Sequence, residues 1–121
     1  MIEVVAAIIK VNDKFLCCQR SKNKYNYLSR KFEFPGGKVE DNETNEQALI
    51  REIKEELSLS ISIESFFSTI NYSYPDFNIK MHCYLCSVEK FDIKLNEHIS
   101  YKLIQKNKLK SLDWIPADLE L

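Results

Sequence analysis

Gly36 to Leu59 reads GGKVEDNETNEQALIREIKEELSL, a glycine pair followed by a stretch dense in carboxylates. The apolar residues of its second half recur at helical spacing: Ala48, Leu49, Ile53 and Leu57. This period predicts an amphipathic helix whose apolar face docks on a sheet. Thr44 precedes the pattern and Gln47 follows three residues later, as in a capping box. We therefore expect a helix that begins after Thr44 and is attached to a core along one face.

The other face of this predicted helix carries three acids. Glu52, Glu55 and Glu56 stand at i, i+3 and i+4, so a helix places them side by side. Neighbouring carboxylates repel one another, whereas Mg2+ takes oxygen ligands, and the acids therefore indicate a metal site. The alternative is a solvated helix of good helix formers, which explains Glu46. It does not explain the Phe-Pro-Gly-Gly sequence at residues 34–37, just before the helix.

The whole stretch resembles the Nudix box, a pattern of spaced Gly, Glu, Arg-Glu and Glu-Glu residues. The matching positions here are Gly37, Glu43, Arg51, Glu52, Ile53, Glu55, Glu56 and Leu59. Ser58 is the one departure, since the pattern has glycine there. A glycine at that place ends a helix with positive φ, so Ser58 should cost on the order of 1 kcal/mol of backbone strain. It carries no metal ligand, and we do not interpret it as a loss of activity.

The resemblance covers almost the whole chain and implies one Nudix domain over residues 1–121, with the box at residues 37–59. The implied fold is α/β: an α/β/α sandwich with a mixed β-sheet. Three further segments look like the MutT branch of the family, which includes the CTP pyrophosphohydrolases: KFEFPGGK at 31–38, YSYPD at 72–76 and PAD at 116–118. The sequence ends at Leu121, so we expect a final helix shorter than is usual in that branch.

In this family the acids hold a divalent cation, and the expected cofactor is Mg2+, with Mn2+ as the alternative. The residues that the resemblance assigns to the metal are the Gly37 carbonyl, Glu52, Glu55, Glu56 and Glu97. The residues that it assigns to catalysis are Arg51, Glu52, Glu55 and Glu97, with Glu52 or Glu97 as the general base. Arg51 would orient the acids through hydrogen bonds, and Glu43 would assist it. From the sequence alone, an exposed loop acid is an equally good interpretation of Glu97.

The reaction that the resemblance implies is hydrolysis of a nucleoside triphosphate. Phosphate oxygens repel a nucleophile, and a cation that neutralises them favours attack of water on the β-phosphorus. The products would be a nucleoside monophosphate and pyrophosphate. The candidate substrates are 8-oxo-dGTP and CTP or dCTP, and the candidate role is sanitation of the nucleotide pool, a form of DNA repair. The alternatives are an enzyme acting on another nucleoside diphosphate derivative and a catalytically silent nucleotide-binding module.

Six residues are candidates for contacts with the nucleotide: Arg20, Phe34, Lys38, Tyr74, Phe77 and Asp118. Arg20 ends the second predicted strand, where a guanidinium could bind phosphate or could be a surface charge. One of the aromatic residues could stack on the base.

Asp118 has two interpretations. It is either a helix N-cap or the base-facing residue that follows Pro-Ala in MutT-like proteins. An ionised carboxylate only accepts hydrogen bonds, so Asp118 would favour bases with donor edges, such as cytosine, guanine and 8-oxoguanine. Uracil and thymine should then be rejected.

The composition bounds the partners and the location. The chain has 17 basic and 18 acidic residues and a net charge of −1, so a nucleic-acid duplex is not an expected partner. No apolar run is long enough to span a membrane, and the first residues lack the features of a secretory signal. We expect a cytoplasmic monomer or homodimer that binds a small nucleotide, without a nucleic-acid or membrane partner.

The remaining chain predicts strands around the acidic helix. The apolar run Ile2–Ile9 is typical of a strand buried on both faces, and Asn12-Asp13 is a turn signal. The expected strands span residues 2–9, 14–20, 31–34, 60–70, 78–88 and 99–104. Residues 21–30 should form a loop over the site, 105–112 a short helical turn and 116 onward the start of a final helix. The glycine pair would let the backbone approach a ligand closely.

The four cysteines form two closely spaced pairs, Cys17 with Cys18 and Cys83 with Cys86. On a strand, the members of each pair would point to opposite faces of the sheet. We therefore interpret them as buried free thiols rather than as zinc ligands or disulfides.

Overall fold

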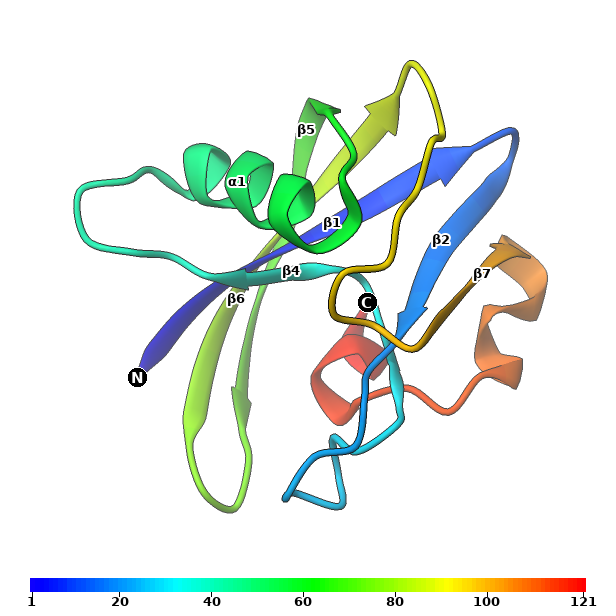
Figure 1. Ribbon diagram of the computed structural model, residues 1–121. Coiled ribbons are helices and arrows are strands. Elements are labelled where there is room, and N and C mark those ends of the chain that lie inside the picture. The colour runs from blue at the N-terminus through cyan, green and yellow to red at the C-terminus, as the bar shows by residue number, and fades with distance from the viewer.

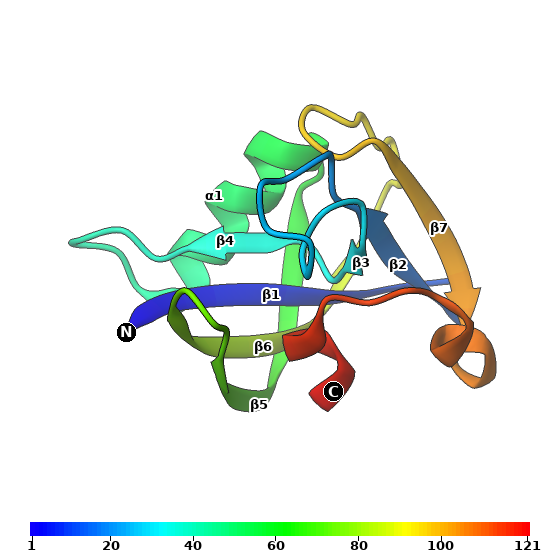
Figure 2. The same ribbon diagram turned by 90° about the horizontal axis from the view of Figure 1, so that it is seen from below.

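The computed structural model describes residues 1–121 and combines one α-helix with a mixed β-sheet (Figure 1). Its elements are β1 (Ile2–Val11), β2 (Lys14–Gln19), β3 (Phe32–Glu33), β4 (Gly36–Lys38), α1 (Asn45–Leu57), β5 (Ile61–Ser73), β6 (Asn78–Val88), β7 (Ser100–Gln105) and the 3-10 helices η1 (Lys106–Ser111) and η2 (Pro116–Glu120). α1 lies on one face of the sheet and η2 on the other (Figure 2). None of the helices has the length and apolar character that a membrane crossing requires. The predicted α/β class and mixed sheet are confirmed.

β1 is the central strand of the sheet. One edge pairs in parallel with β6 along Ile2–Ile9. The other edge pairs antiparallel with β4 over Val4–Ala6 and with β2 at Lys10 and Val11. β1 is therefore hydrogen-bonded on both sides, and Val5–Ile9 is buried, as its continuous apolar sequence predicts.

α1 begins and ends where the sequence predicts. The Thr44 hydroxyl accepts a hydrogen bond from the Gln47 N–H at 3.1 Å, and the Gln47 side chain accepts one from the Thr44 N–H at 2.9 Å, which completes the capping box. Ser58 follows the last turn with φ 56° and ψ 30°, the left-handed conformation expected at that place.

Two apolar clusters lie on the two faces of the sheet. The cluster under α1 contains the predicted buried face of the helix together with Val5, Ala7 and Ile9 of β1. The other cluster contains the alternate residues of β1 and the C-terminal residues Trp114, Ile115 and Ala117. Cys17 and Cys18 fall in different clusters, as do Cys83 and Cys86, and all four are buried free cysteines, as predicted.

The structure adds detail that the sequence did not predict at the glycine pair and at the C-terminus. Gly36 and Gly37 lie in a strand, β4, and neither has positive φ. A Cβ at Gly36 would overlap the Val5 carbonyl oxygen, so this glycine is needed for the contact between two strands. The final helix is a 3-10 helix of five residues, in which the Asp118 N–H donates to the Ile115 carbonyl oxygen at 3.1 Å.

We predict that Ser58→Gly raises the free energy of unfolding by up to about 1 kcal/mol, because glycine adopts the left-handed conformation without Cβ strain. Loss of the Ser58 hydroxyl, which accepts a hydrogen bond from Asn96 at 3.2 Å, should reduce this gain. Urea titration of both proteins measures the difference. Ser60→Gly is the control, because Ser60 has no positive φ. Glycine only adds conformational entropy to the unfolded chain there, so the free energy of unfolding should fall by about 0.5 kcal/mol. A loss of stability in Ser58→Gly as large as in Ser60→Gly would contradict the strain.

Candidate active site

A cavity of about 530 Å3 lies against β1, and all six residues predicted to contact a nucleotide line it: Arg20, Phe34, Lys38, Tyr74, Phe77 and Asp118. They come from the end of β2, the β3–β4 segment, the turn between β5 and β6, and η2. Gly36 and Gly37 also line it. The fold therefore gathers these residues around one space, although they are distributed over almost the whole chain.

Three aromatic residues that line this cavity, Tyr25, Tyr74 and Phe77, belong to a larger aromatic stack. The ring of Tyr27 stacks between Tyr25 and Tyr74, at centroid distances of 5.3 Å and 5.0 Å. The Tyr27 hydroxyl donates to Asp76 at 2.6 Å, and Phe77 packs against Tyr74 at 5.2 Å. The loop after β2, predicted to cover the site, is thus attached to the β5–β6 turn.

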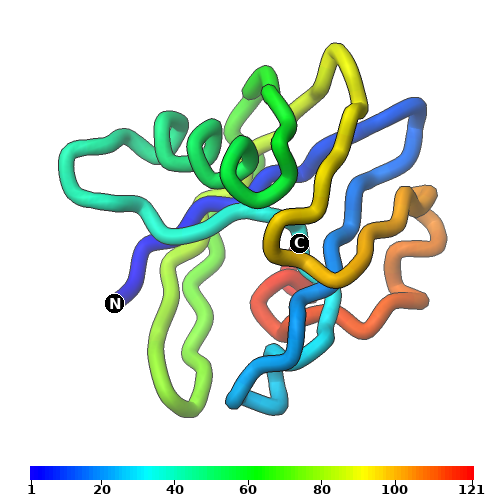
Figure 3. The backbone as a smooth tube through the Cα atoms, in the orientation of Figure 1, coloured from blue at the N-terminus to red at the C-terminus, as the bar shows by residue number.

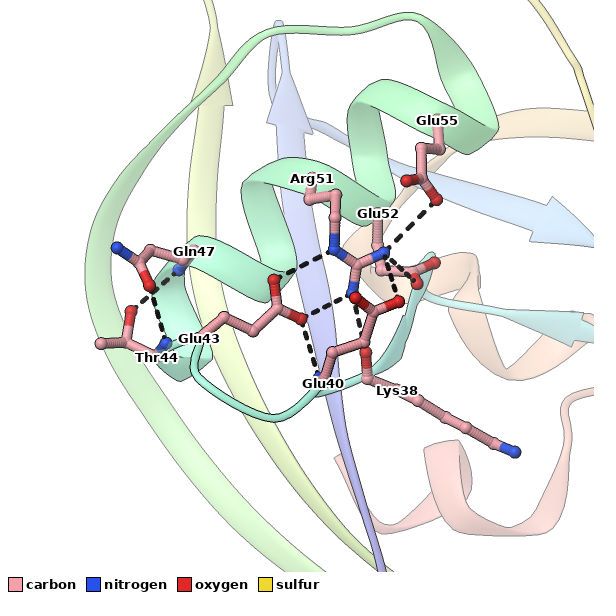
Figure 4. Close-up of polar contacts among 8 residues, drawn as sticks. All are labelled: Lys38, Glu40, Glu43, Thr44, Gln47, Arg51, Glu52 and Glu55. Carbon is pink, nitrogen blue, oxygen red and sulfur yellow. Dashed lines mark hydrogen bonds and ion pairs between the residues drawn. The ribbon is translucent and has the colours of Figure 1, made fainter.

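Arg51 organises the acids beside the cavity (Figure 4). Its Nε and Nη2 donate to the Glu43 carboxylate at 3.0 Å and 2.7 Å. Its Nη1 donates to Glu52 at 2.9 Å and to Glu55 at 3.4 Å, and Nη2 also reaches the Lys38 carbonyl oxygen at 3.1 Å. The hydrogen bonds with Glu43 and Glu52 raise the pKa of Arg51, so the guanidinium remains charged.

The three acids of α1 have different environments. The Glu55 side chain is 58% exposed and that of Glu52 15%, whereas Glu56 is buried. No group of three acidic, histidine or cysteine side chains converges closely enough to hold a cation together. Arg51 occupies one oxygen of Glu52 and one oxygen of Glu55, which leaves the second oxygen of each carboxylate for another partner.

The acids nevertheless fit a divalent cation. Glu56 Oε1 is buried without a hydrogen-bond partner. Burial, a hydrogen bond with Glu97 and the charges of Glu33, Glu52 and Glu97 raise the pKa of Glu56 to about 10. A Cβ at Gly37 would overlap the Glu52 carboxylate, so the glycine lets this acid reach the backbone of β4. Carboxylate and carbonyl oxygens with excess negative charge are the donor set that a hard cation needs.

An ion pair that was not predicted from the sequence, Arg20 with Glu33, connects the cavity to His98 in the segment before β7. Glu33 accepts hydrogen bonds from Arg20 Nη1 and from His98 Nε2, both at 2.8 Å. Burial alone would raise the pKa of Glu33, but the His98 hydrogen bond and the Arg20 charge outweigh it and lower the pKa. The sequence held one clue to this buried acid: Glu33 is a charged residue between Phe32 and Phe34, which are both buried.

Asp118 lies in the cavity wall and is buried. Its Oδ2 accepts a hydrogen bond from the Phe34 N–H at 2.7 Å, and Oδ1 has no partner. The helix-cap interpretation is wrong, because η2 is capped by Ile115 without a side-chain bond. Burial raises the pKa of Asp118 well above its ordinary value, and the negative charge of Glu33 adds to this, while the Phe34 hydrogen bond and the Arg20 charge oppose it. This shift favours the neutral carboxylic acid over the ionised form that the sequence led us to expect.

We predict that Asp118→Asn makes the protein more stable than wild type, by a margin that grows as the pH rises from about 4. Near the ordinary pKa of aspartate, about 3.9, the unfolded wild-type chain begins to release a proton that folded Asp118 retains. The wild type therefore loses stability as the pH rises toward the folded pKa, and the amide variant does not. Thermal unfolding between pH 4 and pH 9 measures the margin. Asp92→Asn is the control, because Asp92 is exposed. If the difference in stability between Asp118→Asn and the wild type did not change with pH, the raised pKa of Asp118 would be contradicted.

The Nudix domain family model matches residues 1–120. The CTP pyrophosphohydrolase of Escherichia coli (strain K12) is 33% identical over 123 residues, covering 100% of this chain and 88% of that protein. The 8-oxo-dGTP diphosphatase of Proteus vulgaris is 33% identical over 94 residues, covering 76% of this chain and 81% of that protein. The solution structure of the DNA mismatch repair protein MutT from methicillin-resistant Staphylococcus aureus 252 superposes with a TM-score of 0.74, at 39% identity over 98% of this chain and 90% of the other. Together with the intact Arg51-Glu52 and Glu55-Glu56 of the box, these matches establish that the chain is a Nudix hydrolase of the MutT-like branch.

Proposed function

We propose that this protein hydrolyses a nucleoside triphosphate to a nucleoside monophosphate and pyrophosphate, with Mg2+ as the cofactor. The observation that carries the proposal is the position of Gly37. This glycine lines the cavity that holds the six nucleotide candidates, and it lies directly against the Glu52 carboxylate of α1. A nucleotide whose base occupied the cavity could therefore extend its phosphates along β4 toward the acids.

The chain's own residues have distinct roles in this proposal. Glu52, Glu55, Glu56, Glu97 and the Gly37 carbonyl would hold Mg2+, which supplies positive charge that neutralises the phosphate oxygens. Arg51 keeps Glu52 and Glu55 in place through its hydrogen bonds. The general base in this proposal is Glu52 or Glu97, and Glu52 is the one that Arg51 holds in place.

Arg20 and Lys38 are the proposed phosphate contacts. Both line the cavity, and the Lys38 side chain points away from the acid cluster, whereas its carbonyl faces Arg51 (Figure 4). Arg20 is held by Glu33 through Nη1 and its Nε is buried, so Nη2 is the nitrogen left for a phosphate oxygen.

Asp118 is the proposed base contact. Because Oδ2 is occupied by the Phe34 N–H, Oδ1 is the atom left for a ligand, and in a neutral acid it can carry the proton and donate. An O–H donor suits an acceptor on the base, such as the carbonyl or ring nitrogen of cytosine or the carbonyl of guanine and 8-oxoguanine. Uracil and thymine also carry carbonyl acceptors, so a neutral Asp118 would not by itself reject them. The similarity to both a CTP pyrophosphohydrolase and 8-oxo-dGTP diphosphatases supports this range of substrates. We propose that the protein serves nucleotide-pool sanitation.

We predict that Glu52→Gln and Glu55→Gln each reduce pyrophosphate release by about 100-fold or more, the loss expected when a strong electrostatic stabiliser is deleted. The assay measures pyrophosphate from CTP, dCTP, 8-oxo-dGTP, dGTP and UTP in saturating Mg2+, with the nucleotide product identified by chromatography. Glu46→Gln is the matched control, because Glu46 lies on the same helix and contacts Tyr84 rather than Arg51. A wild-type protein that binds these nucleotides without cleaving any of them would instead be a binding module.

We predict that Asp118→Asn keeps the wild-type order of preference among those nucleotides, whereas Asp118→Leu loses it. The amide presents an N–H donor where the neutral acid presents an O–H, and leucine presents neither. Specificity constants for the panel, measured at one pH, test this. If Asp118→Leu retained the wild-type order, Asp118 would not contact the base. If Asp118→Asn changed the order, the ionised form of Asp118 would be the one that binds.

A further inference from the structure

The segment between β6 and β7, which carries Glu97, passes the C-terminal end of α1 (Figure 3). Residues 89–99 form neither helix nor strand, and Glu97 itself is exposed. The residues on either side of Glu97 are nevertheless held by specific hydrogen bonds. The position of Glu97 is therefore set by its neighbours in the chain.

On one side, Asn96 closes the C-terminus of α1. The last carbonyl groups of a helix have no partner within it. Here the Glu55 carbonyl oxygen accepts from Asn96 Nδ2 at 2.8 Å, and the Glu56 carbonyl oxygen accepts from the Asn96 N–H at 2.9 Å. The Leu57 carbonyl oxygen accepts from the Lys94 N–H at 2.9 Å. The segment is therefore docked on the helix that carries the other acids.

Ser58 takes part in this docking. Asn96 Nδ2 also donates to the Ser58 hydroxyl at 3.2 Å. Ser58 stands where the Nudix box has glycine, and glycine offers no such acceptor. The one departure of this chain from the box therefore adds a contact to the segment that carries Glu97.

On the other side, His98 attaches the segment to the cavity wall. The His98 side chain is 4% exposed, and its Nε2 donates to Glu33 Oε2 at 2.8 Å. Glu33 accepts from Arg20 through its other oxygen. Glu97 thus lies between an anchor on α1 and an anchor on the Arg20–Glu33 pair.

We infer that Asn96 and His98 are positioning residues that hold Glu97 beside the acids of α1. This inference rests on the proposed function, because it takes Glu97 to be a ligand of the cation. Two anchored neighbours leave the Glu97 backbone little freedom, so binding a cation would require little further ordering of the chain. Without the anchors, Glu97 would be one of several exposed acids on a mobile segment.

The first test replaces one anchor and measures the metal site without nucleotide. Partners that orient a metal ligand typically contribute 10–100-fold to affinity or activity, so Asn96→Ala should weaken Mn2+ binding in calorimetry by about 10-fold. Amide hydrogen exchange of residues 94–98 in metal-free protein should become faster. Asn107→Ala, an exposed asparagine in η1, is the control and should change neither quantity. Asn96→Ser gives the same measurements should the alanine variant fail to fold.

The second test asks whether Asn96 acts through Glu97. Pyrophosphate release should show a kcat about 10-fold lower for Asn96→Ala, with KM for the nucleotide nearly unchanged. In a Glu97→Gln background, Asn96→Ala should cause no further loss of kcat. A full additional loss in that background would make Asn96 a structural residue only.

The third test separates the His98 hydrogen bond from packing. His98→Gln retains an N–H donor near the Nε2 position and should keep most of the Mn2+ affinity, whereas His98→Leu should not. Equal affinities in both variants and the wild type would overturn the assignment of His98. If Glu97→Gln itself bound Mn2+ and turned over as the wild type does, the role of Glu97 in the proposed function would fail. Hydrogen exchange in Asn96→Ala would still report separately whether the anchor exists.

Discussion

One guanidinium, that of Arg51, compensates the acids on which the site depends. Glu43, Glu52 and Glu55 all lie within hydrogen-bonding distance of it, and without that positive charge they would repel one another. Arg51 also donates to the Lys38 carbonyl oxygen, so the same side chain connects α1 to β4. Because β4 borders the cavity, the position of the acids relative to the cavity depends on this residue.

The buried carboxyl groups divide into one that is compensated and two that are not. Glu33 lies between Arg20 and His98, and its pKa is lowered in spite of burial. Glu56 and Asp118 each have a buried oxygen without a partner, and burial raises the pKa of both. Burying an unpaired polar atom destabilises a fold, and such groups concentrate at functional sites. On the proposed function, the cation compensates Glu56 and the base compensates Asp118, so each ligand would meet a group that the free protein leaves unsatisfied.

The local elements could be predicted because their signals lie within a few residues of one another. The capping box at Thr44, the left-handed Ser58 and the turn at Asn12-Asp13 each require only a short range of sequence, and the structure has all three. The six nucleotide candidates, which are far apart in the sequence, line one space. The requirement for glycine at position 36 could not be predicted, because it arises from Val5, which is far away in the sequence and lies on the neighbouring strand β1.

By itself, the sequence determined the α/β class, the bounds and the acidic face of α1, the buried central strand and the family. These follow from hydrophobic period, capping residues and motif spacing, which are properties of the chain before it folds. Only the tertiary structure decided which charges are paired and which acids have a raised pKa. His98 and Glu33 are 65 positions apart, and Phe34 and Asp118 are 84 positions apart. Burial and long-range charge pairing set the pKa of a side chain, and neither exists until the strands and η2 have come together.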